Sequence, residues 1–372
     1  MKFWRERSRR PRLNDDKTSD NAGRSSNFEL LRIFAMFGIV VFHIIIHSTV
    51  NLNNASPDDG KQYLYLLFFT LLGHLGNHIF FLLAGYFLAN KAFKFERIKK
   101  LAKQTWFYSV SISLVVLAVA VFGITAQYGY NLHLTFAELA KAFLPIVTGR
   151  YWFITTYIIV ILISPCLNML LKKLSKEQFK TGLIVAIGVF YLLTMLGLNY
   201  EPNINFNMIG HLLQYGLTYV LGVYFALHPP QLKRRALYPM FLVYAVIVFW
   251  ALYSNIYLPD GMVISNIRTD WLPFAGAVLM FLLFRSFKMP NIRIINSIAA
   301  CVFPIYLIHE HPYVWVILNK HILDLQSLMG TRWVYLFPWL SGILVFTACL
   351  LIELTRKKIV SIYDKKRLKN LE

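Results

Sequence analysis

The stretch that decides the fold is FELLRIFAMFGIVVFHIIIH, residues 28–47, an apolar run interrupted by ionisable side chains. A membrane-spanning helix needs about 20 mostly apolar residues to cross roughly 30 Å of hydrocarbon, and this stretch has that length. Arg32 and His43 are eleven residues apart, which is about three helical turns, so they share one face of the helix. Glu29 and His47 lie close to the same face. The stretch therefore predicts a span with a polar stripe that faces a cleft.

The composition of the whole chain indicates that lipid is its main solvent. Hydrophobic residues make up 57% of the 372 residues and charged residues only 15%, which excludes an ordinary soluble domain. A net charge of +20 could indicate nucleic acid, but the cations are scattered between apolar runs and form no single basic face. We therefore expect a multi-pass protein of the cell membrane, with membrane lipid and no nucleic acid as partner.

The expected fold class is all-α, a polytopic transmembrane helical bundle of ten spans. Of the 38 Lys and Arg residues, 31 lie on the side that carries both termini and six on the opposite side. Because short loops rich in Lys and Arg stay in the cytoplasm, both termini are predicted to be cytoplasmic. We expect a disordered basic tail over 1–27, a transmembrane domain over 28–353 and a basic cytoplasmic tail over 354–372. The predicted spans are 28–50, 63–89, 105–126, 151–171, 181–199, 208–227, 237–257, 271–286, 295–318 and 333–353.

Two other spans carry ionisable side chains, which are costly in hydrocarbon and therefore mark candidate functional sites. His74 and His78 are one helical turn apart in the second span, so both can face one cleft. A pair of histidines lacks the third ligand of a zinc signature, so we expect no metal here. Hydrogen bonding between helices is the more common role.

In the ninth span, His309 and Glu310 reach about the same depth as His43, so the three side chains can meet. Two structural interpretations also stay open. His43 can be a hydrogen-bonded core histidine, and the run at 309–311 can mark the wet outer end of a shorter helix.

Five motifs in the same order resemble those of the membrane-bound acyltransferase family 3, whose members O-acylate bacterial cell-surface sugars and some other acceptors. Two positions depart from the family pattern. Ala84 replaces a serine, which removes a hydroxyl, and Lys100 replaces the second arginine of a basic pair, which exchanges a guanidinium fork for a point charge. The motifs are Arg32 to His43 with ten residues between them, FFLLAGYF at 80–87, ERIKK at 96–100, YWFITTYIIVILISPCLN at 151–168 and IYLIHEHP at 305–312.

The resemblance implies an O-acetyltransferase that moves an acyl group, most simply acetyl, from cytoplasmic acyl-coenzyme A to a hydroxyl of a cell-surface or lipid-linked glycan at the outer face. No metal is expected. A transporter or flippase of a lipid-linked sugar is the alternative, since buried ionisable groups also mark transport pathways. The expected catalytic residues are His43, His309 and Glu310, the donor-binding residues are Arg32, Arg97 and Lys100, and the acceptor-binding residues are Tyr151, Trp152, His74 and His78.

Two chemical routes are compatible with these residues. In the first, His43 is the general base that accepts the proton of the acceptor hydroxyl, and Glu310 orients it. In the second, a histidine attacks first and carries the acyl group covalently, with His309 and His43 sharing the work. The sequence alone leaves both routes open.

Overall fold

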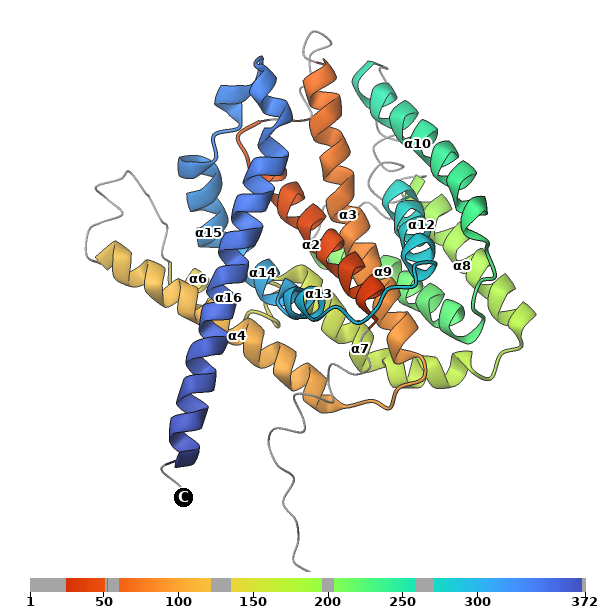
Figure 1. The fold of residues 1–372 in the computed structure, drawn as a ribbon, viewed down its shortest axis with the longest axis horizontal. Coiled ribbons are helices and arrows are strands. Elements are labelled where there is room, and N and C mark those ends of the chain that lie inside the picture. The colour runs from red at the N-terminus through yellow and green to blue at the C-terminus, as the bar shows by residue number, and fades with distance from the viewer. Residues whose placement is uncertain are drawn as a thin grey trace, which may run out of the picture.

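The computed structural model describes residues 25–50, 52, 60–121, 135–195, 204–257 and 271–369, and this part of the chain is built from helices without a strand (Figure 1). The predicted all-α class is confirmed. Residues 1–24 of the predicted N-terminal tail lie outside the described residues. The helices are α2 (Ser26–Ile46), α3 (Gly60–Leu88), α4 (Phe95–Val121), α6 (Phe136–Phe143), α7 (Trp152–Leu171), α8 (Lys176–Met195), α9 (Ile204–Leu227), α10 (Arg234–Tyr257), α12 (Leu272–Arg285), α13 (Arg293–Ala299), α14 (Val302–His309), α15 (Pro312–Ile317) and α16 (Phe337–Lys369).

Seven of the described helices, namely α2, α3, α4, α7, α8, α10 and α16, are long and apolar enough to cross a membrane. Helix α12 and the segment Arg293–His309 are shorter apolar helices. Helix α9 has 24 residues and packs against α3. The chain is therefore a polytopic helical bundle, as predicted, whereas the count of ten spans and the cytoplasmic position of both termini remain predictions.

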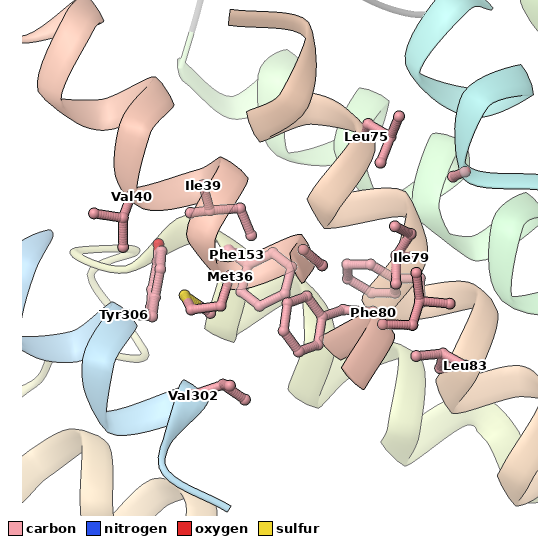
Figure 2. Packing of buried hydrophobic residues seen from close by; sticks show 14 of the residues in the cluster. Met36, Ile39, Val40, Leu75, Ile79, Phe80, Leu83, Phe153, Val302 and Tyr306 are labelled. Carbon is pink, nitrogen blue, oxygen red and sulfur yellow. The ribbon is translucent and has the colours of Figure 1, made fainter. Parts of the chain in front are cut away.

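Helices α2 and α3 form the centre of the bundle (Figure 1). Helix α3 also packs against α9 and α12, while α13, α14 and α16 pack against α2. Apolar residues on the inner face of α2, among them Leu31, Met36 and Val40, are fully buried in the main hydrophobic cluster. Figure 2 shows this core, in which side chains of α2 meet those of α3, α7 and α14.

Two glycines bring α3 and α9 into close contact. A Cβ at Gly85 would overlap the carbonyl oxygen of Tyr219, and a Cβ at Gly222 would overlap that of Leu82. Small residues at helix crossings let two backbones approach closely inside a membrane, where packing rather than water exclusion drives association. The sequence pattern had not singled out this crossing.

The predicted ninth span, 295–318, is broken into three short helices. Pro304 lacks an N–H, so the carbonyl of Ala300 has no helical donor, and α13 ends at Ala299. That carbonyl instead accepts a hydrogen bond from Lys357 Nζ at 3.1 Å. Pro312 occupies the first turn of α15, after a second break at Glu310. The second break frees His309 and Glu310 to project toward α2.

Helix α16 continues to Lys369, well beyond the predicted end of the last span at residue 353. Glu353 is fully buried and accepts two hydrogen bonds from Arg356, at 2.6 and 2.9 Å, and one from the hydroxyl of Tyr108 on α4. A buried carboxylate needs such partners because leaving it unpaired would be costly. This junction fastens α4 to α16.

Candidate active site

Four side chains form a largely buried polar cluster where α2 meets the break between α14 and α15. His43 Nδ1 lies 3.0 Å from His309 Nε2 and 3.1 Å from Glu310 Oε2. His47 Nε2, one helical turn after His43, lies 3.2 Å from the same oxygen of Glu310. Three of these residues, His43, His309 and Glu310, are the predicted catalytic residues, and the structure brings them together.

The backbone determines which ring nitrogens in this cluster carry a proton. His309 Nδ1 lies 2.7 Å from the carbonyl oxygen of Ile305, which can only accept, so this nitrogen is a donor. In the neutral imidazole, His309 Nε2 is then an acceptor, and the hydrogen between the two rings belongs to His43 Nδ1. Glu310 is a second acceptor for the same hydrogen. Neutral His43 therefore has its lone pair on Nε2, the nitrogen that faces away from the carboxylate.

The same three side chains are the donor set that could hold a metal. One ligand atom from each of His43, His309 and Glu310 lies within 4.8 Å of the others. Two imidazoles and a carboxylate are a known zinc set. The hydrogen bonds described above satisfy these atoms without an ion, and the absence of a metal stays a prediction.

A cleft of about 670 Å³ opens among α2, α3, α4, α7 and α14, on the N-terminal side of His43 along α2. Arg32 and Arg97, two predicted donor-binding residues, both line it. Arg32 Nη1 lies 2.5 Å from Glu29 Oε1, and its guanidinium lies 5.3 Å from the ring centre of Phe87. The polar stripe predicted for the first span thus begins in this cleft and ends at the histidine cluster.

Two aromatic rings separate the cleft from the histidines. Phe153 of α7 lines the cleft, and its ring centre is 5.5 Å from that of Tyr306. The Tyr306 ring is in turn 6.1 Å from the imidazole of His43. Figure 2 shows both rings within the packed core, with Met36 of α2 beside them. The distance along α2 from Arg32 to His43 is about 16 Å, from the helical rise per residue.

Lys100, the third predicted donor-binding residue, lies elsewhere. It lines a separate groove of about 930 Å³ between α4, residues 143–147 and Arg356. Its neighbours there include the exposed rings of Trp106 and Phe107. Residues three apart on a helix differ by about 60° in direction around its axis, and here Arg97 and Lys100 line different cavities beside α4.

The predicted acceptor residues Tyr151 and Trp152 are packed inside the bundle. Tyr151 is 1% exposed, and its hydroxyl donates to the carbonyl of Leu307 at 3.3 Å. Its ring centre is 6.1 Å from that of Tyr306. Trp152 stacks on His211 of α9 at 4.2 Å. Tyr151 therefore supports α14, the helix that carries His309.

The two histidines of the second span contact different helices, His74 contacting α2 and His78 contacting α9. His74 has its ring centre 4.9 Å from that of Phe42, the neighbour of His43. His78 is fully buried, and its Nδ1 lies 2.8 Å from Thr218 Oγ1 on α9. Because Thr218 donates its own hydrogen to Gln214, His78 Nδ1 is the donor in this contact. His78 thus makes the interhelical hydrogen bond that is the common role of such residues.

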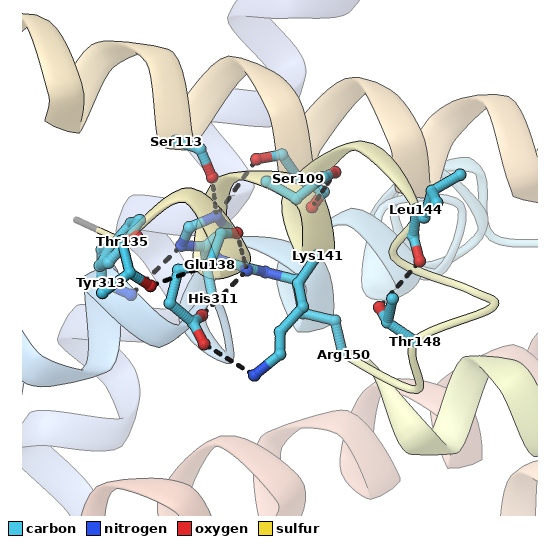
Figure 3. Close-up of polar contacts among 11 residues, drawn as sticks. Ser109, Ser113, Thr135, Glu138, Lys141, Leu144, Thr148, Arg150, His311 and Tyr313 are labelled. Atoms are coloured by element: carbon cyan, nitrogen blue, oxygen red, sulfur yellow. Dashed lines mark hydrogen bonds and ion pairs between the residues drawn. The ribbon is translucent and has the colours of Figure 1, made fainter. Parts of the chain in front are cut away.

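A second polar cluster, shown in Figure 3, lies beside the first. His311 Nε2 lies 3.3 Å from the carbonyl of Ser109 and 3.2 Å from Ser113 Oγ on α4, and its Nδ1 accepts from the backbone N–H of Tyr313 at 3.3 Å. Both ring nitrogens are therefore occupied. His311 fixes the start of α15 to α4 and so holds the loop that carries Glu310.

Arg150 in the same cluster was not singled out by the sequence pattern. Its side chain is 3% exposed, its Nη1 donates to the carbonyl of Glu138 at 3.2 Å, and it lies 3.5 Å from Glu138 Oε2. The guanidinium is 5.7 Å from the ring centre of Tyr313 (Figure 3). In the sequence, a cation just before YWF at 151–153 is indistinguishable from an ordinary loop charge, and its burial has no signal there.

Comparison with known proteins identifies one family. The family model described as an acyltransferase domain matches residues 25–355, which is most of the chain. No curated protein and no solved structure matches.

Proposed function

Since this chain belongs to the acyltransferase domain family, we propose that it moves an acetyl group from cytoplasmic acetyl-coenzyme A to a hydroxyl of a cell-surface or lipid-linked glycan at the outer face of the cell membrane. The observation that carries this proposal is the buried contact of His43 with His309 and Glu310, at 3.0 and 3.1 Å, beyond a cleft that contains Arg32 and Arg97. The family match favours this function over the transporter alternative.

The proposed reaction uses His43 as the general base. As the acceptor oxygen attacks the thioester carbon, its proton passes to His43 Nε2, and Glu310 next to Nδ1 compensates the charge of the imidazolium. The tetrahedral intermediate then breaks its C–S bond, and His43 returns the proton to the departing thiolate. An ester and free coenzyme A are formed, and His43 is neutral again.

The tautomers of the two histidines favour this direct route over a covalent carrier at His309. A nucleophile needs a free lone pair, and the lone pair of His309 Nε2 accepts the hydrogen of His43 Nδ1. His309 is then a positioning residue that shares the orientation of His43 with Glu310.

The donor side of the proposal rests on charge and size. Coenzyme A is polyanionic, and Arg32 and Arg97 provide guanidinium groups at the basic part of the cleft. The rest of the lining includes apolar residues such as Phe80, Phe153 and Val302, which suit a pantetheine arm and a short acyl chain. For the thioester to reach His43, the ring of Phe153 must move aside, and the thioester then passes Tyr306.

The test is a sided transfer assay. Full-length protein is expressed in cells, and inside-out and right-side-out membrane vesicles that enclose extracted glycan or lipid-linked saccharide are given radiolabelled acetyl-coenzyme A on their outside. We expect label on the acceptor only when the donor reaches the cytoplasmic face.

A His43→Ala variant at equal protein level is the control and should give no transfer. Transfer that requires the donor on the outer face, or transfer that persists in the His43→Ala variant, would contradict the proposal. The alternative is contradicted by label transfer itself, because a flippase moves the saccharide without acylating it.

A further inference from the structure

The cleft with Arg32 lies next to a second, smaller cavity of about 350 Å³. The two cavities share Leu88, Lys91, Arg97 and Ile161 in their linings, so these residues form the wall between them. The smaller cavity lies between the α3–α4 connection and the C-terminal end of α7. Loops from two different helical connections therefore converge on it.

The smaller cavity is strongly basic. Four cations line it, Lys91, Lys94, Arg97 and Lys172, and no carboxylate does. Within the described part of the chain, none of the four forms an ion pair. Unpaired cations that converge on one concave site favour an oxyanion such as a phosphate.

The same cavity also offers surfaces for a flat ring. Phe93, whose side chain is 42% exposed, lines it together with Pro165 and Met169. Aromatic rings stack on nucleobases irrespective of base identity. Asn168 forms part of the wall, and its side chain is held by the carbonyl of Leu88 at 3.3 Å.

We propose that this smaller cavity binds the adenosine 3′,5′-bisphosphate end of the acyl donor, with the 3′-phosphate on Lys94 and Lys172 and the adenine against Phe93. This inference rests on the proposed function, since it concerns the same donor. The pantetheine arm then runs from Arg97 through the larger cleft toward His43. If these lysines served only to hold their loops in the cytoplasm, the lysines that line the cavity and their neighbours that do not would be equivalent.

The test combines variants with donors that differ by one phosphate. Reconstituted full-length protein is assayed for the donor KM with acetyl-coenzyme A and with acetyl-dephospho-coenzyme A, which lacks the 3′-phosphate. Lys173 is the matched control for Lys172, because it is the next residue in the same loop, is exposed, and does not line the cavity.

For the wild type, we expect loss of the 3′-phosphate to raise KM about tenfold, the size of a charge-assisted contact. Lys172→Ala should raise KM for acetyl-coenzyme A and should distinguish the two donors less than the wild type does, because only Lys94 is left to contact the 3′-phosphate. Lys173→Ala should behave as the wild type. A Lys172→Ala variant that still distinguishes the donors as the wild type does would overturn the inference while leaving acyl transfer intact.

An anionic lipid phosphate is the competing occupant of the cavity, so the assay is repeated in phosphatidylcholine vesicles with and without phosphatidylglycerol. A Lys172→Ala effect that appears only with phosphatidylglycerol and is equal for both donors would overturn the inference. Absence of transfer from any acyl-coenzyme A by the wild type would overturn the proposed donor, and the inference with it.

A second inference rests on an independent observation, the hydroxyl of Tyr306. This side chain is 2% exposed, and its hydroxyl makes no hydrogen bond within the described part of the chain. A buried hydroxyl without a partner is destabilising, which makes this one a candidate functional group. Figure 2 shows the hydroxyl directed toward Val40 of α2, one turn before His43.

We infer that Tyr306 donates a hydrogen bond to the thioester carbonyl oxygen as negative charge develops on it. The ring lies 6.1 Å from the imidazole of His43 and 5.5 Å from Phe153, which lines the donor cleft, so a thioester that reaches His43 passes this hydroxyl. A fixed donor in a site without water stabilises such an oxyanion strongly.

Tyr306→Phe tests this role while keeping the ring. We expect kcat to fall about 10²- to 10³-fold, the usual cost of losing one oxyanion donor, with little change in donor KM. The melting temperature in detergent should stay equal or rise, because the variant removes an unpaired buried hydroxyl. Tyr151→Phe provides the contrast: it should lower the melting temperature, since the carbonyl of Leu307 loses its side-chain donor. A wild-type kcat for Tyr306→Phe, or a fall in kcat that accompanies a lower melting temperature, would overturn the inference.

Discussion

His309 donates its Nδ1–H to the carbonyl of Ile305, one turn earlier in α14, at 2.7 Å, and this contact orients the other nitrogen of the ring toward His43. A helix carbonyl thereby sets the protonation pattern of a histidine on another helix. Glu310 completes the arrangement from the helix break that follows α14. The effects expected of substitutions in this cluster depend on this order of donors and acceptors.

His43→Ala should leave the protein folded and remove acyl transfer. Loss of a positioned general base typically costs about 10²- to 10⁴-fold in rate. The measurement is the initial rate of acetyl transfer at equal protein level, with the melting temperature as the folding control. Near-normal turnover would mean that His43 is an ordinary buried histidine of the core.

His309 should tolerate replacement by another acceptor better than by an apolar side chain. In His309→Gln the amide oxygen can still accept from His43 Nδ1–H, whereas in His309→Leu that hydrogen has only Glu310 left. A neutral hydrogen bond contributes about 0.5–1.5 kcal/mol, so kcat for the leucine variant should be up to about tenfold below that of the glutamine variant. Recovery of acyl groups covalently bound to His309 after incubation with donor alone would support the other route.

Arg97→Ala should raise the donor KM more than Lys100→Ala does. Both residues belong to the same basic motif at one end of α4, but Arg97 lines the cleft proposed for the donor and Lys100 lines a separate groove. A lost charge-assisted contact corresponds to roughly a tenfold or greater rise in KM. Equal small shifts of KM in the two variants would indicate that both cations only help to set the orientation of the protein in the membrane.

Gly85→Ala and Gly222→Ala should destabilise the bundle by about 1–3 kcal/mol each, the usual cost of overpacking. The new methyl group at either position would overlap a backbone carbonyl, which cannot give way without moving a helix. Gly216→Ala in the same helix α9 is the matched control, because nothing lies within 4 Å of its Cβ position. Thermal unfolding in detergent measures the difference, and equal midpoints for all three variants would disprove the contact.

Treatment with a strong chelator should leave transfer unchanged. The atoms of His43, His309 and Glu310 that could bind a metal are engaged with one another through hydrogen bonds. The measurement is the transfer rate before and after incubation with 1,10-phenanthroline and desalting. Loss of activity that zinc alone restores would replace the proton-transfer mechanism with a metal-dependent one.

The sequence was sufficient to predict the helical bundle and the meeting of the predicted catalytic residues His43, His309 and Glu310. Spans follow from apolar length, and the depth of His43 and His309 follows from counting residues, so both were accessible without coordinates. The break at Glu310 was harder to predict, since Pro304 and Pro312 each permit a helix start as well as a kink.

Features that depend on which helices touch were not accessible. Gly85 and Gly222 are separated by more than a hundred residues, and only the crossing of α3 with α9 makes them partners. Glu353 was assigned to the last residue of a span, while its burial depends on Tyr108 from α4. Sequence spacing describes one helix at a time and says little about such pairs.

The packed rings of Phe153 and Tyr306 have a consequence for the cell as a whole. If a continuous polar path joined the basic cleft to the histidine cluster, ions would leak through the bundle and dissipate the gradients across the membrane. An apolar layer opposes the passage of ions because neither ions nor the water that carries them are stable there. Phe153 lies between the cleft and Tyr306, and Tyr306 lies between Phe153 and His43. This apolar layer would let an acyl group be transferred across the membrane without opening a path for ions.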